Sequence, residues 1–232
     1  MRNRLRILVP ALVAALALAG AAHPGRVLAA EASTPDPRSS RLRELAVTLQ
    51  HLAPGLDLRP VERALEAAWN ARARGVPVHS DLLTVIDYTR PSWQPRLWVF
   101  DTSSPRLLFM DRVAHGANTG EAFARHFSNA LGSKQTSLGL FLTGETYVGE
   151  NGYSLRLDGL DRGANHLARE RAIVIHGAPY VSDEFVREHG RIGRSWGCPA
   201  VSRDLAKPLI DTIRGGSLVY AYFEPDAGST ER

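Results

Sequence analysis

The sequence predicts a mainly β fold of the α+β class, with short helices at the rim of the sheet and a small helical segment before it. After residue 80, most of the chain consists of short runs of β-branched and aromatic residues, which Pro, Ser and Gly separate. Sustained helical periodicity is concentrated between residues 40 and 75. The hydrophobic content is 44%, as in ordinary globular proteins, so a chain of 232 residues can bury a core.

Two amphipathic helices are predicted near the N-terminus. The first begins after Ser40, a candidate N-cap, and ends at Pro54-Gly55; its leucines fall on one face. The second begins near Pro60, and its apolar residues repeat with helical spacing from Val61 to Trp69. Two such helices cannot enclose a core by themselves, so we expect them to pack on the domain that follows.

Strands dominate the rest of the chain. The patterns predict strands over Leu82–Tyr88, Leu97–Asp101, Leu107–Ala114, Ser137–Val148, Tyr153–Leu157, Ala172–His176 and Ser217–Phe223, with a hairpin at Gly149–Gly152. They predict helices over Gly163–Arg171, over Ser182–His189 with Ser182 as the cap, and over Leu205–Ile213, where Pro208 must occupy the first turn or kink the helix.

The first 30 residues resemble a secretory signal. Arg2, Arg4 and Arg6 precede an apolar run from Ile7 to Ala22, and small residues suggest cleavage after Ala22 or Ala30. The run is short for a membrane span, so we expect export to the periplasm or cell envelope without stable membrane insertion after cleavage. The expected organisation is a signal peptide (1–30), a linker with two helices (31–78), the main domain (79–225) and a polar tail (226–232).

The charge balance gives no indication of nucleic-acid binding. The formal net charge is +4, but the leader contains four arginines and no acidic residue. Without the leader, 24 basic and 24 acidic side chains remain. We therefore expect no nucleic-acid partner.

Cys198 is the only cysteine, and its surroundings favour a reactive role. It stands in a polar, glycine-rich segment of loop composition, Gly190–Pro199. His176-Gly177 ends the predicted buried strand that precedes it. A thiol on a loop and a histidine at a strand end are the components of a nucleophile–base pair. The alternative is a buried structural cysteine and a capping histidine.

Several neighbouring residues are candidates for supporting roles. The amides of Gly197 and Cys198 are candidate oxyanion donors, because a glycine before the nucleophile lets the backbone turn toward a substrate carbonyl. His115 repeats the strand-His-Gly pattern and is either a second pocket histidine or a strand-end residue. Further candidates for lining a substrate groove are Ser195, Trp196, Gly177 and Asn129. No metal-ligand spacing and no phosphate-binding loop occurs in the sequence, so we expect no metal and no cofactor.

At these residues the chain resembles the murein L,D-transpeptidase catalytic domain family, the YkuD-like fold. The similarity is carried by His176-Gly177 and Arg194-Ser-Trp-Gly-Cys-Pro-Ala-Val201, and it extends over about 81–223. The commoner family pattern has His where Trp196 stands and an Arg shortly after the cysteine, where this chain has Pro199-Ala200-Val201.

The resemblance implies a β-sandwich-like fold and a cysteine acyl-enzyme. It implies that the partners are peptidoglycan stem peptides, as donor and as acceptor, with diaminopimelate at the third position of the donor. Two alternatives stay open. One is an L,D-carboxypeptidase or endopeptidase that hydrolyses the same bond, and the other is a non-catalytic cell-wall-binding protein. The sequence leaves the oligomeric state open.

Overall fold

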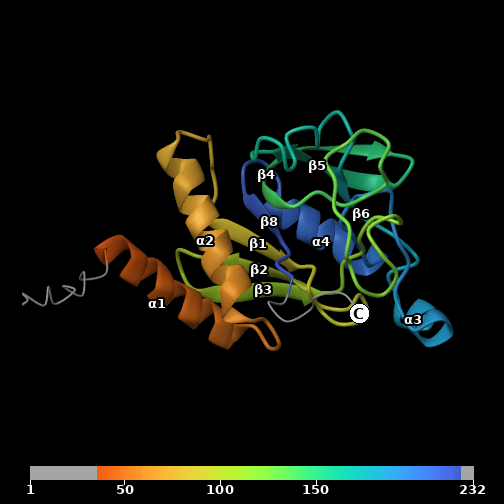
Figure 1. The fold of residues 1–232 in the computed structure, drawn as a ribbon, viewed down its shortest axis with the longest axis horizontal. Coiled ribbons are helices and arrows are strands. Elements are labelled where there is room, and N and C mark those ends of the chain that lie inside the picture. Colours follow the sequence, from red (N-terminus) through yellow and green to blue (C-terminus); the bar gives the residue numbers. More distant parts are fainter. Residues whose placement is uncertain (1–35, 226–232) are drawn as a thin grey trace, which may run out of the picture. The chain divides into compact units, whose positions relative to one another are not determined.

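The computed structural model describes residues 36–225, and all its strands belong to one eight-stranded sheet (Figure 1). The strands are β1 (Leu82–Asp87), β2 (Leu97–Asp101), β3 (Arg106–Asp111), β4 (Gly139–Gly149), β5 (Gly152–Gly159), β6 (Val174–Gly177), β7 (Ala200–Val201) and β8 (Leu218–Tyr222). Their order in the sheet is β3-β2-β1-β8-β4-β5-β6-β7. The β1–β8 and β6–β7 pairs are parallel and the others antiparallel. The predicted mainly β, α+β class is confirmed.

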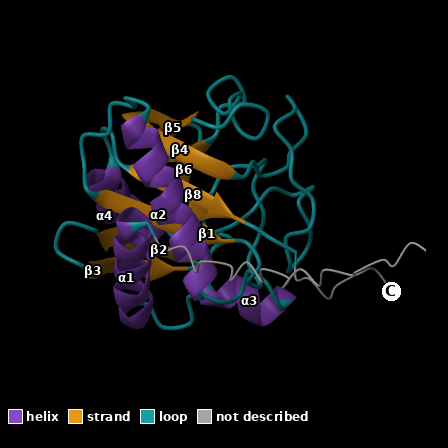
Figure 2. Cartoon of the chain, turned by 60° about the vertical axis from the view of Figure 1, so that its left-hand side comes forward, coloured by secondary structure: helices purple, strands orange, loops and turns teal. Residues whose placement is uncertain are grey.

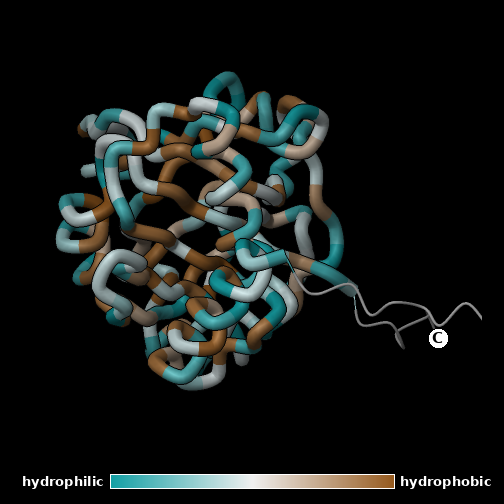
Figure 3. The backbone as a smooth tube through the Cα atoms, turned by 90° about the vertical axis from the view of Figure 1, so that its left-hand side faces the viewer, coloured by the Kyte–Doolittle hydropathy of each residue, from teal (hydrophilic) through white to brown (hydrophobic). Residues whose placement is uncertain are grey.

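One hydrophobic core draws on both halves of this sheet. Ile86 of β1 and Val99 of β2 belong to the same buried cluster as Leu155 of β5 and Ile175 of β6. The helix α4 (Arg203–Ile213) closes this cluster with its apolar side. The arrangement is sandwich-like, although hydrogen bonding continues through all eight strands. In Figure 3 the hydrophobic segments of the backbone gather in the interior.

A second core lies beneath the helices α1 (Pro37–Leu52) and α2 (Leu58–Ala73), which cover the sheet as Figure 2 shows. Leu49 of α1 and Ala64 of α2 are fully buried with Trp98 and Phe100 of β2. Both predicted N-terminal helices are present. The first begins earlier than expected, because the carboxylate of Asp36 accepts the Arg38 amide and serves as its cap.

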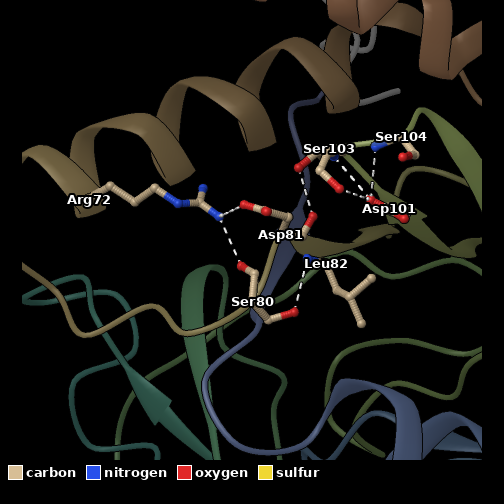
Figure 4. A network of polar contacts seen from close by, with 8 residues as sticks. Arg72, Ser80, Asp81, Leu82, Asp101, Ser103 and Ser104 are labelled. Carbon is tan, nitrogen blue, oxygen red and sulfur yellow. Dashed lines mark hydrogen bonds and ion pairs between the residues drawn. The ribbon is translucent and has the colours of Figure 1, made fainter.

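A polar network fixes α2 to the start of β1 (Figure 4). Arg72 donates to the Ser80 carbonyl at 3.0 Å and lies 3.6 Å from the Asp81 carboxylate. The Ser80 hydroxyl accepts the Leu82 amide, and the Asp101 carboxylate accepts two serine amides in the β2–β3 turn. The contacts are largely exposed, so they set orientation more than stability.

The prediction of a helix over Gly163–Arg171 is wrong; the segment is a series of turns. The Asn165 side chain accepts the Asp161 amide at 2.8 Å and donates to the Leu140 carbonyl at 2.9 Å. Asp161 in turn accepts the Leu140 amide at 2.7 Å. These side-chain bonds to backbone groups replace those of a helix and tie the segment to the start of β4.

Smaller differences concern the ends of elements. The third strand ends at Asp111, before the predicted Ala114, and Pro208 lies inside α4 instead of in its first turn. The two-residue strand β7 was not predicted, because it is too short to show a pattern. The helix α3 (Asp183–His189) has the predicted Ser182 cap. Within residues 36–225, no helix combines the length and apolar character that crossing a bilayer requires.

Candidate active site

Cys198 ends a tight turn, Ser195–Cys198, which leads directly into β7. The Ser195 hydroxyl donates to the Cys198 carbonyl at 2.6 Å and accepts the Gly197 amide at 3.1 Å. Gly197 has φ +121, and a Cβ there would stand 2.7 Å from the Gln135 carbonyl oxygen. Backbone conformation and close packing therefore both require glycine beside the nucleophile. Ser195 is buried and holds the turn together.

The pairing of β6 with β7 brings the segment that carries Cys198 alongside the strand that ends in His176-Gly177. His176 pairs with Ala200 in the parallel ladder. Extending this register by two residues would set Cys198 opposite Val174, and the Val174 backbone amide is among the groups that lower the pKa of Cys198. From the strand spacing and rise, the Cα atoms of Cys198 and His176 are about 8 Å apart. Within residues 36–225 the polar contacts of the two side chains go to the Gly177 and Ala172 carbonyls, and the strand register alone relates the pair.

His176 is held in the tautomer that a general base needs. Its side chain is buried, and Nδ1 lies 3.1 Å from the Gly177 carbonyl oxygen. A carbonyl only accepts, so we assign the proton to Nδ1, which leaves the Nε2 lone pair free. Burial lowers the pKa of His176. The imidazole is therefore neutral at pH 7 and ready to take a proton.

The thiol of Cys198 is half-buried and lies 3.6 Å from the Ala172 carbonyl oxygen. Burial raises the pKa of Cys198, and the Val174 amide and the Arg171 charge oppose this shift. The resting cysteine is thus a thiol at neutral pH, so attack requires a base. Ala172 has φ +53, an uncommon conformation for a residue with a side chain, at the point where its carbonyl meets the sulfur.

A hollow of about 400 Å³ opens beside His176. This volume lies within the range of small-molecule and peptide sites. Its lining residues come from the β4–β5 hairpin, the segment after β6, and α4: Glu150, Asn151, Gly152, Tyr153, His176, Gly177, Ala178, Pro179, Tyr180, Arg203, Ala206 and Lys207. The hollow can therefore receive a chain that approaches the histidine side of the pair.

The predicted groove residues have different environments. Trp196 is 74% exposed, and the Lys134 ammonium lies 4.7 Å from its ring centre. Gly177 lines the hollow, and its carbonyl orients His176. Asn129 contacts His166 at 2.9 Å and accepts the Leu167 amide at 3.2 Å, so both ends of its amide group are engaged within the protein.

His115 lies beneath the nucleophile turn and is fully buried. Its Nδ1 lies 2.8 Å from Nη2 of Arg96, which can only donate, so Nδ1 accepts. Nε2 then donates to the Gly120 carbonyl at 3.2 Å. Burial, together with the Arg96 charge, lowers the pKa of His115 to about 3. The His115 carbonyl accepts the Ser195 amide, so this histidine supports the turn from below.

Sequence reasoning missed two residues near the sulfur, Arg171 and Tyr180. Arg171 is the last residue of the predicted helix Gly163–Arg171 and was given no role in the site, whereas its charge lowers the pKa of Cys198. The sequence did contain a signal for Arg171, because it is a charged residue shortly before a buried strand that ends in the candidate base. Tyr180 lines the hollow, and burial raises its pKa to about 12. In the described part of the chain, no group of three or more His, Cys, Asp or Glu side chains is arranged to hold a metal ion.

Comparison with known proteins gives one family match. Residues 52–222 match a family model described as L,D-transpeptidase catalytic domain. No curated protein matches the sequence.

Solved structures with related folds share little sequence with this chain. An L,D-transpeptidase from Mycobacterium smegmatis is 16% identical, with 62% of this chain and 59% of that chain covered and a TM-score of 0.38. The helical cell shape determining protein Pgp2 from Campylobacter jejuni is 12% identical, with 62% and 48% covered and a TM-score of 0.44. The L,D-transpeptidase from Xylanimonas cellulosilytica is 18% identical, with 78% and 93% covered and a TM-score of 0.37. This chain thus spans about half to three fifths of the first two.

Proposed function

Because the chain belongs to the L,D-transpeptidase catalytic domain family, we propose that it is an exported cysteine acyl-transferase that acts on peptidoglycan stem peptides. The observation that carries this proposal is the parallel β6–β7 ladder, which brings the strand that ends in His176-Gly177 alongside the segment that carries Cys198. The neutral, oriented imidazole and the half-buried thiol are the two groups that acyl transfer through a thioester needs. The chemistry we propose requires no cofactor.

In the acylation step, His176 takes the thiol proton as the sulfur attacks the carbonyl carbon of the third stem residue. The carbonyl electrons move onto oxygen, and the tetrahedral intermediate collapses when the C–N bond breaks and His176 protonates the departing D-alanine amine. The Cys198 amide, which makes no hydrogen bond within the described residues, is one donor for the oxyanion. The Gly197 amide becomes a second donor when its bond to the Ser195 hydroxyl opens.

In the transfer step, an acceptor amine attacks the thioester carbon, His176 removes its proton, and the sulfur leaves. A transferase must keep water away from the thioester. The 116–137 loop supports this assignment, because it packs against the nucleophile turn: Gly116 bridges to Ser195, and a Cβ on Gly116 would stand 3.0 Å from the Gly197 Cα. The same machinery with water as acceptor is a carboxypeptidase or endopeptidase.

The deciding experiment offers the purified protein (residues 31–232) a defined tetrapeptide muropeptide, with and without an acceptor amine, and reads the products by mass spectrometry. We expect cross-linked dimer or acceptor adduct to exceed tripeptide when the acceptor is present. Tripeptide as the main product at every acceptor concentration would identify a hydrolase. No turnover, together with an unreactive thiol, would identify a wall-binding protein.

Variants of the pair test the mechanism in the same assay. Cys198→Ala and Cys198→Ser should both abolish turnover, because the serine hydroxyl is far less acidic than the thiol. His176→Ala should lower the rate by about 10²–10⁴-fold. The matched control is His126→Ala, which changes an exposed histidine and should keep the wild-type rate. Turnover in Cys198→Ala would refute the proposed nucleophile.

A further inference from the structure

Arg171 fastens the loop that lies against the nucleophile. Its guanidinium donates to four acceptors, all within residues 128–137. These are the carbonyls of Ser128 at 2.7 Å and Gln135 at 2.5 Å, the Ser133 hydroxyl at 3.1 Å and the Ser137 hydroxyl. Since one planar group holds four points of the loop, the loop is fixed relative to the start of β6.

The same guanidinium lies directly beside the nucleophile turn. A Cβ at Gly197 would stand 3.2 Å from Nη2 of Arg171, so nothing larger than a glycine hydrogen separates the two. The Arg171 charge lowers the pKa of Cys198, and a negative sulfur in return favours the protonated guanidinium.

The charge of Arg171 has no carboxylate to balance it. Its four acceptors are neutral oxygens, and none of the ion pairs found in residues 36–225 includes it, although it is half-buried. Two residues earlier, Arg169 is exposed and paired with both Glu145 and Asp158. Removing an unpaired charge from water costs free energy. Burial of the Arg171 guanidinium therefore destabilises the fold, and a negative charge on Cys198 would offset part of this cost.

Other titratable groups that face the sulfur carry no charge near neutral pH. Burial raises the pKa of both Tyr88 and Tyr180, so both phenols stay protonated. Burial lowers the pKa of His176, so the imidazole is neutral. Arg171 is therefore the one fixed positive charge in this group.

We propose that Arg171 is a positioning residue that holds the 128–137 loop against the nucleophile turn. Its positive charge favours the Cys198 thiolate, and it also favours the oxyanion that forms on the substrate carbonyl when the sulfur attacks. The oxyanion part rests on the acyl-transfer function proposed above. The thiolate part does not, and the experiment below measures it separately.

The test follows alkylation of Cys198 by iodoacetamide across pH, in which the thiolate sulfur displaces iodide. Cys198 is the only cysteine, so the reaction reports one site. We expect Arg171→Gln to raise the midpoint of the pH–rate profile by about one pH unit, and to slow alkylation at pH 7 about three- to tenfold. Arg169→Gln, with its charge already matched by two carboxylates, should leave the midpoint unchanged.

Arg171→Lys separates charge from shape. It keeps the charge but not the planar fork, so we expect a midpoint within a few tenths of a unit of wild type and faster protease cleavage between residues 128 and 137. If Arg171→Gln does not fold, Arg171→Lys decides the question. A midpoint of the pH–rate profile raised by a full unit in Arg171→Lys overturns the proposal. An unchanged midpoint in folded Arg171→Gln also overturns it. Alkylation requires no muropeptide, so these results stand whether or not acyl transfer is detected.

Discussion

Two histidines that share the same sequence pattern, predicted strand-His-Gly, illustrate how single residues acquire different roles. His176 keeps one ring nitrogen free at the sheet edge, next to a hollow. His115 has both ring nitrogens engaged, one by a fully buried arginine and one by a backbone carbonyl. The first can exchange a proton with a substrate, whereas the second is a structural acceptor that must stay neutral to accept from Arg96.

The neutral state of His115 makes the stability of the protein depend on pH. Its folded pKa of about 3 lies below the ordinary value of 6.5. Between these two pKa values, His115 is protonated in the unfolded chain but not in the folded chain. The free energy of unfolding therefore decreases as the pH falls below about 6.5 toward 3. At pH 5 this group alone should cost about 2 kcal/mol relative to pH 7.

Urea unfolding at pH 7 and pH 5 measures this effect. His115→Gln keeps an acceptor for Arg96 but does not titrate, so the variant should lose less stability between the two pH values than the wild type. His126→Gln, at an exposed position, should behave like the wild type. The same pH dependence in His115→Gln and wild type would show that another group controls acid unfolding.

At the scale of elements, the short strand β6 organises the site. It pairs with β5 on one side and β7 on the other, so its four residues are fixed along both edges. Ile175 belongs to the core cluster against which Cys198 also packs, and His176 lines the hollow. The turns before β6 supply Arg171 and the Ala172 carbonyl, and the turn before β7 supplies Cys198. The reacting groups of the proposed mechanism thus lie within a few residues of β6 or of its partner β7.

The helix α1 offers a matched pair of leucines for testing how firmly the N-terminal helices are joined to the sheet. Leu49 is fully buried in the core beneath α1 and α2, and Leu52, three residues later, is 40% exposed. Leu49→Ala should lower the free energy of unfolding by about 2–5 kcal/mol, because it leaves a cavity. Leu52→Ala should change it by less than about 1 kcal/mol.

Chemical denaturation followed by circular dichroism measures both leucine variants. If the helices and sheet unfold as one unit, Leu49→Ala shifts a single transition to lower denaturant. A separate early transition that involves only helical signal would show that α1 and α2 melt independently of the sheet.

In the folded unit, residues 36–225, the N-terminal helices and the candidate active site lie at different parts of the sheet. The helices α1 and α2 pack over β1, β2, β8 and the start of β4, whereas the site lies at the β6–β7 edge (Figures 1 and 2). The β3 edge, near which α1 packs, is at the opposite end of the strand order. Changes in the helical layer should therefore affect stability without altering the chemistry.

Export is a prediction about the whole chain, and the leader lies outside the described residues. The positive n-region and the apolar run that follows should direct the protein across the inner membrane. N-terminal sequencing of the mature protein should find a start between Ala22 and Ser33. An intact Met1 on a soluble cytosolic protein would contradict export.

The local patterns of the sequence predicted most of the elements and the candidate nucleophile–base pair. Alternating and β-branched runs located the strands, and Pro60, Ser182 and the N-terminal leucines marked helices, because strand periodicity and caps depend on neighbouring residues. His176-Gly177 and Cys198 were identified from a strand end and a glycine-rich loop. The segment 163–171 was misassigned because the bonds of Asn165 to Leu140, which replace those of a helix, cross 25 residues of sequence.

Only the tertiary structure decided which charges surround the sulfur and which histidine is free. Arg171 meets the Ser128 carbonyl 43 residues away, and His115 meets Arg96 across 19 residues. Whether a charge is balanced, and how far a pKa moves, depends on burial and on partners that no local pattern specifies. The sequence therefore located the chemistry, whereas the packing of distant segments set the protonation states on which that chemistry depends.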